Sequence, residues 1–427
     1  MVDSQSLTLS RPEFYESRRI QLTSPLLHIG SAVSQLNPFE YVQTAKKVYL
    51  PDAEALAKSL QARGRLNDYI RAIEERDEIA DILKQAFGED WQEASDPEGN
   101  PIFPEIAISA KWTEQKITDL RPMIRNGFGQ LYIPGSSIKG AIRTAITYHL
   151  LKHADRYHVP KSQRVSEIEK QLRQKLNSGE LKSKWKQKFL DDELLMNDLF
   201  SNFYLNYQDR PIKARTGPNT DFMRAIQVTD CQPLVKITVN QKGKAIPFNV
   251  PIAVEVIVSS HFEDERAKYR ASIYAEMVRN VRTEFTLSLD TTMLSWFRHQ
   301  QGMQLPFQSL DDVLKICQEF AQEQWDGEYD YWQAIKNNRH QGKNLDVSAI
   351  REFYEKETCP YSLRLGWASG MNGTTIGWLL NDQLRADIRD TCGIAAPNFE
   401  APKSRRTVLD PKGEIKYVPG WLKFRGL

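Results

Sequence analysis

The sequence predicts a folded protein of the α+β class, and three observations lead to this prediction. The two best strands, at 234–240 and 250–260, are rich in β-branched residues and alternate between apolar and polar positions. Stretches with helical composition, such as 52–94, are separated from these strands by long loops. Because strands and helices interleave irregularly, a doubly wound parallel sheet fits the pattern less well.

The bulk composition is that of a folded, water-soluble protein. The chain has 427 residues, 41% of them hydrophobic, which is enough for two or three domains with their own cores. It has no apolar run long enough to span a membrane, and its N-terminus lacks the apolar core of a secretory signal. Its 4 cysteines form no C-x-x-C pair, which argues against a zinc knuckle or a disulfide scaffold. We therefore expect a cytoplasmic protein.

The charges are distributed unevenly along the chain, although the net charge is only +2. Segments 111–152, 161–190 and 403–425 are strongly basic, whereas 71–100 carries ten acidic residues against three basic ones. This asymmetry indicates a polyanionic partner on one side of the molecule. For 161–190, a helix face that contacts only solvent is an equally good interpretation.

The sequence also predicts the order of strands and helices along the chain. We expect a first strand within 19–33, a helix from about 137 to 153, and helices in 161–200. Segments 262–282 and 308–356 also have helical composition, and the C-terminal tail is typical of a strand, a turn and a strand. We place a domain boundary near residue 250, which divides the chain into 1–250, with helical insertions at about 52–94 and 156–205, and 251–427.

The most informative short stretch is YIPGSSIKGAIRTAI, at 132–146. Pro134 ends a strand, Gly135 allows a turn, and Ser136 or Ser137 is suited to cap the helix that follows. The first amides of a helix form an anion site, and Lys139 and Arg143 share one helix face. The stretch therefore predicts a phosphate site, although a capped helix with a solvated basic face is an alternative.

A second unusual stretch, GWASGMNGTTIG, contains four glycines within twelve residues. Such a loop allows backbone amides to line a concave surface against phosphate or ribose. A long hairpin turn without a ligand is the alternative. We expect this loop and the 132–146 stretch to come together as one cradle for a sugar-phosphate chain. The candidate residues of this second region are Arg364, Gly366, Gly370, Gly373, Gly377, Lys403, Arg405 and Arg406.

Taken together, these stretches resemble the RAMP superfamily of CRISPR proteins. The IPGSSIKGAIRTAI motif and the C-terminal glycine-rich loop carry the resemblance. The stretches LTSPLLHIGSAVSQLNPFEYV, DFMRAIQVTD and PKSRR…GWLKF most resemble the capping subunit of the type III-A (Csm) effector complex. The related capping subunits of type III-B complexes share some of these motifs.

The resemblance has implications for fold, partners and site. It implies tandem ferredoxin-like (RRM-related) domains and a subunit that caps a filament at the 3′ part of the guide RNA and supports guide maturation in antiviral defence. The implied partners are the guide RNA, other Csm-complex RAMP subunits, target RNA and host nucleases. It adds a basic loop at 210–224 as an RNA-binding thumb, with Lys213, Arg215 and Arg224, and His28 and Gly30 as further contacts.

The alternative to a non-catalytic binding subunit is a RAMP-type endoribonuclease that cuts guide precursor or target RNA. Metal-free RNA cleavage needs a general base and a general acid, and His28 lies beside a glycine turn where cutting relatives place a catalytic residue. Asp221 is a second candidate, because backbone subunits of such filaments cut with an aspartate in a comparable loop. His149 and His153 share a helix face, but no Glu or Cys cluster lies near them in the sequence, so we expect neither a metal nor a cofactor. A scaffold that binds no RNA is the third possibility.

Overall fold

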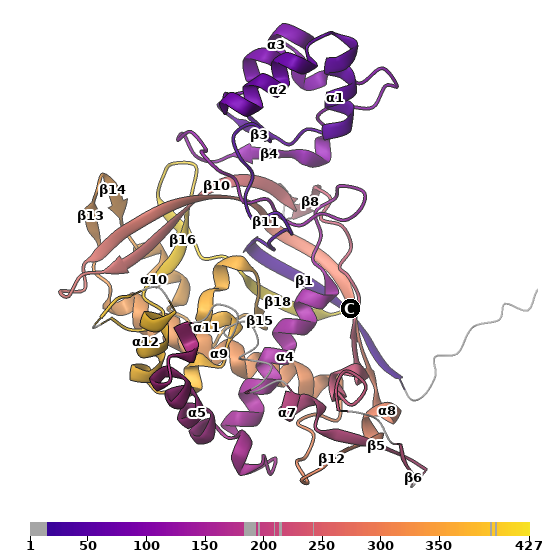
Figure 1. The fold of residues 1–427 in the computed structure, drawn as a ribbon, viewed down its shortest axis with the longest axis vertical. Coiled ribbons are helices and arrows are strands. Elements are labelled where there is room, and N and C mark those ends of the chain that lie inside the picture. Colours follow the sequence, from indigo (N-terminus) through magenta and orange to yellow (C-terminus); the bar gives the residue numbers. More distant parts are fainter. Residues whose placement is uncertain are drawn as a thin grey trace, which may run out of the picture.

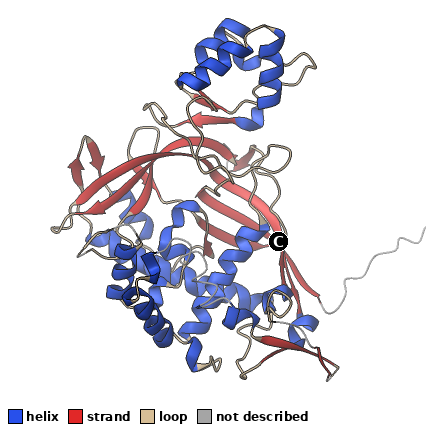
Figure 2. Ribbon diagram, in the orientation of Figure 1, coloured by secondary structure: helices blue, strands red, loops and turns tan. Residues whose placement is uncertain are grey.

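A long curved β-sheet organises the protein, with most helices packed under one of its faces (Figures 1 and 2). The computed structural model describes residues 15–182, 194, 197–208, 210–212, 216–241, 243–392, 395–397 and 399–427. Within this described part, no helix combines the length and the apolar character needed to cross a membrane. The α+β class predicted from the sequence is confirmed.

Three long strands form the centre of the sheet: β1 (Tyr15–Leu27), β10 (Val250–His261) and β11 (Ala267–Asp290). The first half of β11 pairs antiparallel with β10, and its second half pairs antiparallel with β1. The sheet therefore combines strands from both sides of residue 250, and the division of the chain there stays a prediction. The path through the main sheet is β15-β18-β1-β11-β10-β4-β3-β2.

The remaining strands are short. The path is completed by β2 (Val42–Gln43), β3 (Lys47–Tyr49), β4 (Ile108–Lys111), β15 (Leu363–Arg364) and β18 (Trp421–Gly426). Off the path, β16 (Arg405–Leu409) pairs with β10 and β17 (Ile415–Tyr417), and β7 (Ile226–Val228) pairs with β11. Smaller sheets comprise β5 (Phe203–Tyr207), β6 (Arg210–Ile212) and β12 (Phe297–His299), then β8 (Ile237–Gln241) with β9 (Lys244–Phe248), and β13 (Asn338–His340) with β14 (Lys343–Leu345).

The helix expected at 262–282 is wrong, because most of this segment belongs to strand β11. The helical interpretation followed from the Ala, Glu and Arg content of the segment, although AKYRAS also alternates between apolar and polar residues as a strand does. Here β11 is a central strand, hydrogen-bonded to neighbours on both sides. Cross-strand packing thus overrides the local preference of the chain.

An acidic helical lobe lies on the opposite side of β10 from the other helices (Figure 1). It contains α1 (Ala53–Ala62), α2 (Leu66–Glu75) and α3 (Ala80–Phe87), which confirms the helical prediction for most of 52–94. Asp52 caps α1 by accepting hydrogen bonds from the amides of Glu54 and Ala55. The lobe has its own apolar core, in which Trp91 and Phe103 pack edge to face.

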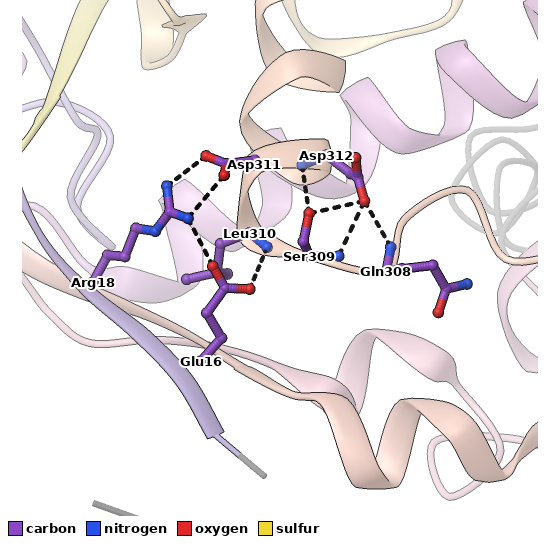
Figure 3. Close-up of polar contacts among 7 residues, drawn as sticks. All are labelled: Glu16, Arg18, Gln308, Ser309, Leu310, Asp311 and Asp312. Atoms are coloured by element: carbon purple, nitrogen blue, oxygen red, sulfur yellow. Dashed lines mark hydrogen bonds and ion pairs between the residues drawn. The ribbon is translucent and has the colours of Figure 1, made fainter. Parts of the chain in front are cut away.

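Two helices under the sheet carry much of the main core: α4 (Gly135–Lys152) and α9 (Leu310–Ala334). The start of α9 is fixed to β1 (Figure 3). Glu16 accepts a hydrogen bond from the Leu310 amide at 2.9 Å, and Arg18 contacts the Asp311 carboxylate at 2.5 and 3.0 Å. Ser309 and Asp312 complete a capping box. The first turn of α9 is therefore held in place, which sets the position of the residues further along this helix.

The other helices surround this pair. They are α5 (Val165–Asn177), α7 (Asn197–Ser201), α8 (Thr291–Trp296), α10 (Ser348–Tyr354), α11 (Gly370–Thr374) and α12 (Asp382–Thr391). Short 3-10 turns occur at Phe222–Ala225, Trp367–Ser369 and Gly377–Leu379. The glycine-rich stretch is thus not an open loop but a series of helical turns.

Candidate nucleic-acid interface

Residues 221–230 pack against the N-terminal end of α4. A Cβ atom on Gly135 would lie 2.4 Å from the Val228 carbonyl oxygen and 2.6 Å from that of Thr229, so only glycine fits there. The Gly135 amide donates a hydrogen bond of 2.7 Å to the Asp230 carboxylate. One amide of the expected anion site is therefore already occupied by a carboxylate of the protein itself.

The two cations of α4 also contact this segment. Lys139 Nζ donates to the Ile226 carbonyl at 2.7 Å, and burial lowers the pKa of Lys139. Arg143 Nη1 donates to the Asp221 carboxylate at 2.6 Å, and its guanidinium lies 4.0 Å from the ring centre of Phe200. These two side chains hold 221–230 against the helix.

Other predicted residues of this region are more accessible. Ser136 is exposed and Ser137 is half-buried, at the first turn of α4. Arg224 is exposed, and its Nη1 donates to the Asn219 carbonyl at 3.0 Å. Lys213 and Arg215 lie outside the described residues.

The glycine-rich segment packs closely against the end of β1. Gly366 has a φ of +102°, and a Cβ there would lie 2.3 Å from the His28 carbonyl oxygen. The Trp367 amide donates to that same carbonyl at 3.1 Å. Gly370 has a φ of +70°, which also favours glycine. Gly366 thus allows a close backbone approach that a side chain would prevent, whereas Gly370 is favoured by its positive φ alone.

Between this segment and the 402–406 stretch lies a cavity of about 230 Å³, which we call the basic cavity. Five of its lining residues are cationic and one, Glu328, is acidic. Two segments separated by thirty or so positions in the sequence therefore contribute to one site. The charged and polar lining residues are Glu328, Arg364, Ser369, Asn372, Arg389, Lys403, Ser404, Arg405 and Arg406, and Gly370 is also in the lining.

Glu328 organises the charges at the inner wall of the basic cavity. It is 2% exposed and lies 3.0 Å from Arg405 Nε and 3.6 Å from Arg364 Nη1. Burial alone would lower the pKa of Arg405, but Glu328, together with Tyr331, Glu400 and Tyr354, outweighs it and the pKa is raised. One carboxylate thus faces two buried guanidinium groups, so positive charge remains in excess.

Five buried side-chain atoms of the lining residues lack a hydrogen-bond partner within the described part of the chain: Nε and Nη1 of Arg364, Oδ1 of Asn372, and Nε of Arg405 and of Arg406. Arg364 is 4% exposed and Asn372 is 2% exposed. Buried polar groups in folded proteins are almost always satisfied, so an unpartnered donor at the wall of a cavity indicates a missing acceptor. An anion would supply it.

Two cations of the lining, Arg406 and Lys403, contact aromatic rings that are not themselves in the lining. The guanidinium groups of Arg121 and Arg406 lie 5.2 and 4.6 Å from the ring centre of Trp367. Arg406 also donates to the Trp367 carbonyl at 3.2 Å, and burial, together with Arg121, lowers its pKa. Lys403 lies 5.5 Å from the ring centre of Phe399. Trp367 is thus engaged by cations of the protein.

The single cradle expected from the sequence is only partly present. Helix α4 contacts β15 and the turn Gly377–Leu379, so the two motifs are neighbours. However, the lining of the basic cavity includes no residue of 132–146. Arg364, Gly370 and the cations of 403–406 are in this lining together, whereas Gly366, Gly373 and Gly377 are not. Arg389 and Glu328 were not among the predicted residues. Arg389 could have been suspected, because it follows Arg385 by four positions on one helix face of α12.

The two catalytic candidates are both engaged within the protein. His28 is 2% exposed, and its Nδ1 lies 2.6 Å from the Glu276 carbonyl oxygen. Burial lowers the pKa of His28. Asp221 accepts from Arg143 and from the Met223 amide, at 2.6 and 2.8 Å. A general base must reach the proton that it removes, and a buried imidazole in this position does not.

The chain belongs to the RAMP superfamily, whose family model matches residues 19–278. The resemblance to type III-A subunits is also confirmed, because the chain is 28% identical to the CRISPR system protein Csm5 of Enterococcus italicus. That alignment of 138 residues covers 28% of this chain and 39% of the relative. It therefore spans well under half the length of that protein.

Two solved structures have a similar fold. One is a chain of a Csm-crRNA-target RNA ternary complex from a type III-A CRISPR-Cas system, with a TM-score of 0.59, 22% identity, and coverage of 96% of this chain and 100% of that one. The other is Csm5 of T. onnurineus, with a TM-score of 0.52, 19% identity, and coverage of 95% and 100%. At such identities the likeness concerns the fold.

Proposed function

We propose that this chain is an RNA-binding subunit of a cytoplasmic type III-A CRISPR ribonucleoprotein. In this role it caps the filament at the 3′ part of the guide RNA and supports guide maturation in antiviral defence. The observation that carries the proposal is the basic cavity, with five cations, one acid and an unpartnered buried guanidinium nitrogen. The family match and the similarity to Csm5 support the same assignment.

The size of the basic cavity suits a phosphate better than a base. Its volume of about 230 Å³ is below the roughly 300–1,000 Å³ of pockets that enclose whole small molecules. A phosphate and part of its ribose would fit, and the guanidinium groups offer the planar donors that phosphate oxygens accept best. We therefore place one phosphate of the guide RNA in this cavity.

The proposed RNA contacts fall into two groups. Those of the basic cavity are direct: Arg364, Lys403, Arg405 and Arg406, with Gly366, Gly370, Gly373 and Gly377 as the backbone that shapes it. Near α4, Ser136, Ser137 and Arg224 are proposed as direct contacts, whereas Lys139 and Arg143 act by holding 221–230 in place. Lys213 and Arg215 stay predicted contacts of the basic loop. The proposal also includes the fold expected from the resemblance, two ferredoxin-like domains in this chain. Its proposed partners are the other Csm subunits, target RNA and host nucleases.

The proposal is tested by the RNA that the assembled complex retains. We would co-express the chain with a CRISPR array and the other subunits, purify the complex through a tag on another subunit, and map the 3′ ends of the bound RNA. The double variant Lys403→Ala/Arg406→Ala should lose the uniform 3′ ends of the wild type. As a control, Lys423→Ala/Arg425→Ala removes two exposed cations of β18 with the same change of charge. Identical 3′ ends in both variants and the wild type would refute the proposal.

The endoribonuclease alternative makes a different prediction. Incubated with labelled repeat-spacer RNA, with and without a divalent metal, the full-length chain should leave the RNA intact and bind it in a salt-sensitive way. Discrete products that disappear in His28→Ala or Asp221→Ala would favour the enzyme instead. If no nucleic acid binds or co-purifies, the chain is a scaffold.

A further inference from the structure

A group of metal-binding residues lies where the C-terminal end of α4 meets α9, away from the basic cavity. It consists of His149, in the last turn of α4, His153, directly after the helix, and Glu319 of α9. His149 Nδ1 lies 2.5 Å from one carboxylate oxygen of Glu319, and His153 Nε2 lies 2.8 Å from the other. One potential ligand atom from each residue lies within 4.8 Å of the others.

The surroundings fix the orientation of these side chains. The second nitrogen of His149, Nε2, lies 2.8 Å from the Tyr157 hydroxyl. His149 is 8% exposed, whereas His153 and Glu319 are half-buried, so the group has access to solvent on one side. A hydrogen-bonded partner on the far nitrogen is the arrangement that orients a metal-binding imidazole.

We propose that His149, His153 and Glu319 bind one divalent transition-metal ion of the zinc type, with water as the fourth ligand. Two imidazoles and one carboxylate are a ligand set that zinc uses in proteins, and histidines four positions apart on a helix can share one ion. Ligand atoms around a tetrahedral zinc are separated by about 3.4 Å, so a pair at the limit of 4.8 Å would have to close by about 1.4 Å, whereas the hydrogen-bonded pairs would have to open slightly.

The contact between His149 Nε2 and the Tyr157 hydroxyl allows His149 to bind a metal through Nδ1. On metal binding, the His149 proton moves from Nδ1 to Nε2, where the Tyr157 oxygen accepts it.

One nearby cation, Lys152, would compete with a metal ion for the Glu319 carboxylate. Lys152 Nζ lies 3.4 Å from Glu319, but it also lies 3.1 Å from Glu323, which can retain it. Glu323 in turn accepts a hydrogen bond from the Tyr148 hydroxyl at 2.6 Å. The exposed side chain of Arg156 is the remaining charge near His149. A bound ion would thus connect the end of α4 to α9, about 14 Å along the helix from Glu328 of the basic cavity.

The test uses the purified full-length chain and cobalt as a spectroscopic probe. After dialysis against a chelator, Co²⁺ is added and the visible absorption of a four-coordinate ion is followed, then Zn²⁺ is added to displace it. We expect one ion per chain. His153→Ala and Glu319→Gln should each weaken Co²⁺ binding by at least about 100-fold, and Tyr157→Phe by about 10-fold, since it removes only an orienting partner.

The matched control is His158→Asn, which removes an exposed histidine from the same region. Asn tolerates the positive φ of 53° at this position. The control should bind Co²⁺ like the wild type, and circular dichroism checks that every variant is folded. The proposal is overturned if the wild type binds no stoichiometric Co²⁺, or if folded His153→Ala and Glu319→Gln bind it as tightly as the control. The test involves no RNA, so it is independent of the proposed function.

Discussion

The N-terminal end of α4 and the glycine-rich segment both combine glycines with cations, but their cations have different surroundings. At α4, Lys139 and Arg143 meet a carbonyl and a carboxylate of 221–230 at 2.7 and 2.6 Å. In the basic cavity, five cations and one acid, Glu328, are in the lining, and Arg364 Nε has no hydrogen-bond partner in the described structure. Of these cations, Arg389 also pairs with Asp390 at 2.8 Å. At α4 both cations have their partners within the protein, whereas in the basic cavity an anion would supply the partner that Arg364 lacks.

This difference shows what a basic motif in a sequence does and does not reveal. The motif identifies which side chains cluster with glycine, but the function depends on whether the fold brings an acid to them. Asp221 and Asp230, from a distant part of the sequence, neutralise α4. At the basic cavity, Glu328 faces Arg364 and Arg405 and Asp390 pairs with Arg389, so the five lining cations still outnumber the acids that contact them.

The largest effect is expected for Glu328→Gln. The substitution leaves two buried guanidinium groups without their acid, which should lower the free energy of unfolding by about 3–5 kcal/mol. Urea denaturation measures this loss. Added phosphate should restore part of it by entering the basic cavity. An Arg143→Ala variant in the same buffers controls for the general stabilisation by phosphate. Equal gains in both variants would argue against an anion site.

A somewhat smaller loss is expected for Gly366→Ala. The new Cβ would strain a positive-φ backbone and meet the His28 carbonyl, which should cost about 2–4 kcal/mol in urea denaturation. Gly140→Ala is the matched control, because a Cβ there meets nothing within 4 Å and alanine favours the helix. That control should gain about 0.5–1 kcal/mol. A loss below 1 kcal/mol for Gly366→Ala would contradict the close approach.

Arg143→Ala should have a moderate effect on stability and little on RNA. It removes a partly buried ion pair and the contact with Phe200, a loss of about 1–3 kcal/mol. A double-mutant cycle with Asp221→Ala, followed by urea denaturation, measures how much of the loss belongs to the pair. If the two single losses simply add, the pair contributes nothing and the interpretation of α4 is wrong.

The smallest effect concerns pH and His28. Because burial lowers the pKa of His28, the unfolded state takes up a proton below about pH 6.5 that the folded state does not. The contribution to stability is therefore full above this pH and declines as the pH falls, by at most about 1.4 kcal/mol per unit. His28→Asn keeps a donor for the Glu276 carbonyl and should flatten this decline between pH 7.5 and 5.5. An unchanged pH profile would show that other groups cause it.

Much of the fold was predictable where the local pattern and the tertiary context agree. Strand β10 alternates and is β-branched, and α4 has a proline and a glycine at its start, so both were found. The segment that becomes β11 was not, because its second half pairs with β1, at the other end of the sequence. The same limit applies to the candidate sites: the sequence identified Lys403 and Arg406, but not Glu328. It placed His149 and His153 on one helix face but predicted no metal there, because the carboxylate beside them, Glu319, lies 166 positions away from His153 on another helix.

The most direct test of the account is the salt dependence of RNA binding by the full-length chain. Each phosphate contact to single-stranded RNA contributes about 0.7 to the slope of log K against log salt. Lys403→Ala/Arg406→Ala should therefore reduce the slope by about 1.4, whereas folded Lys139→Met/Arg143→Met should keep the slope of the wild type. The opposite result, a slope reduced only by Lys139→Met/Arg143→Met, would show that the RNA binds at the N-terminal end of α4 and would contradict the account.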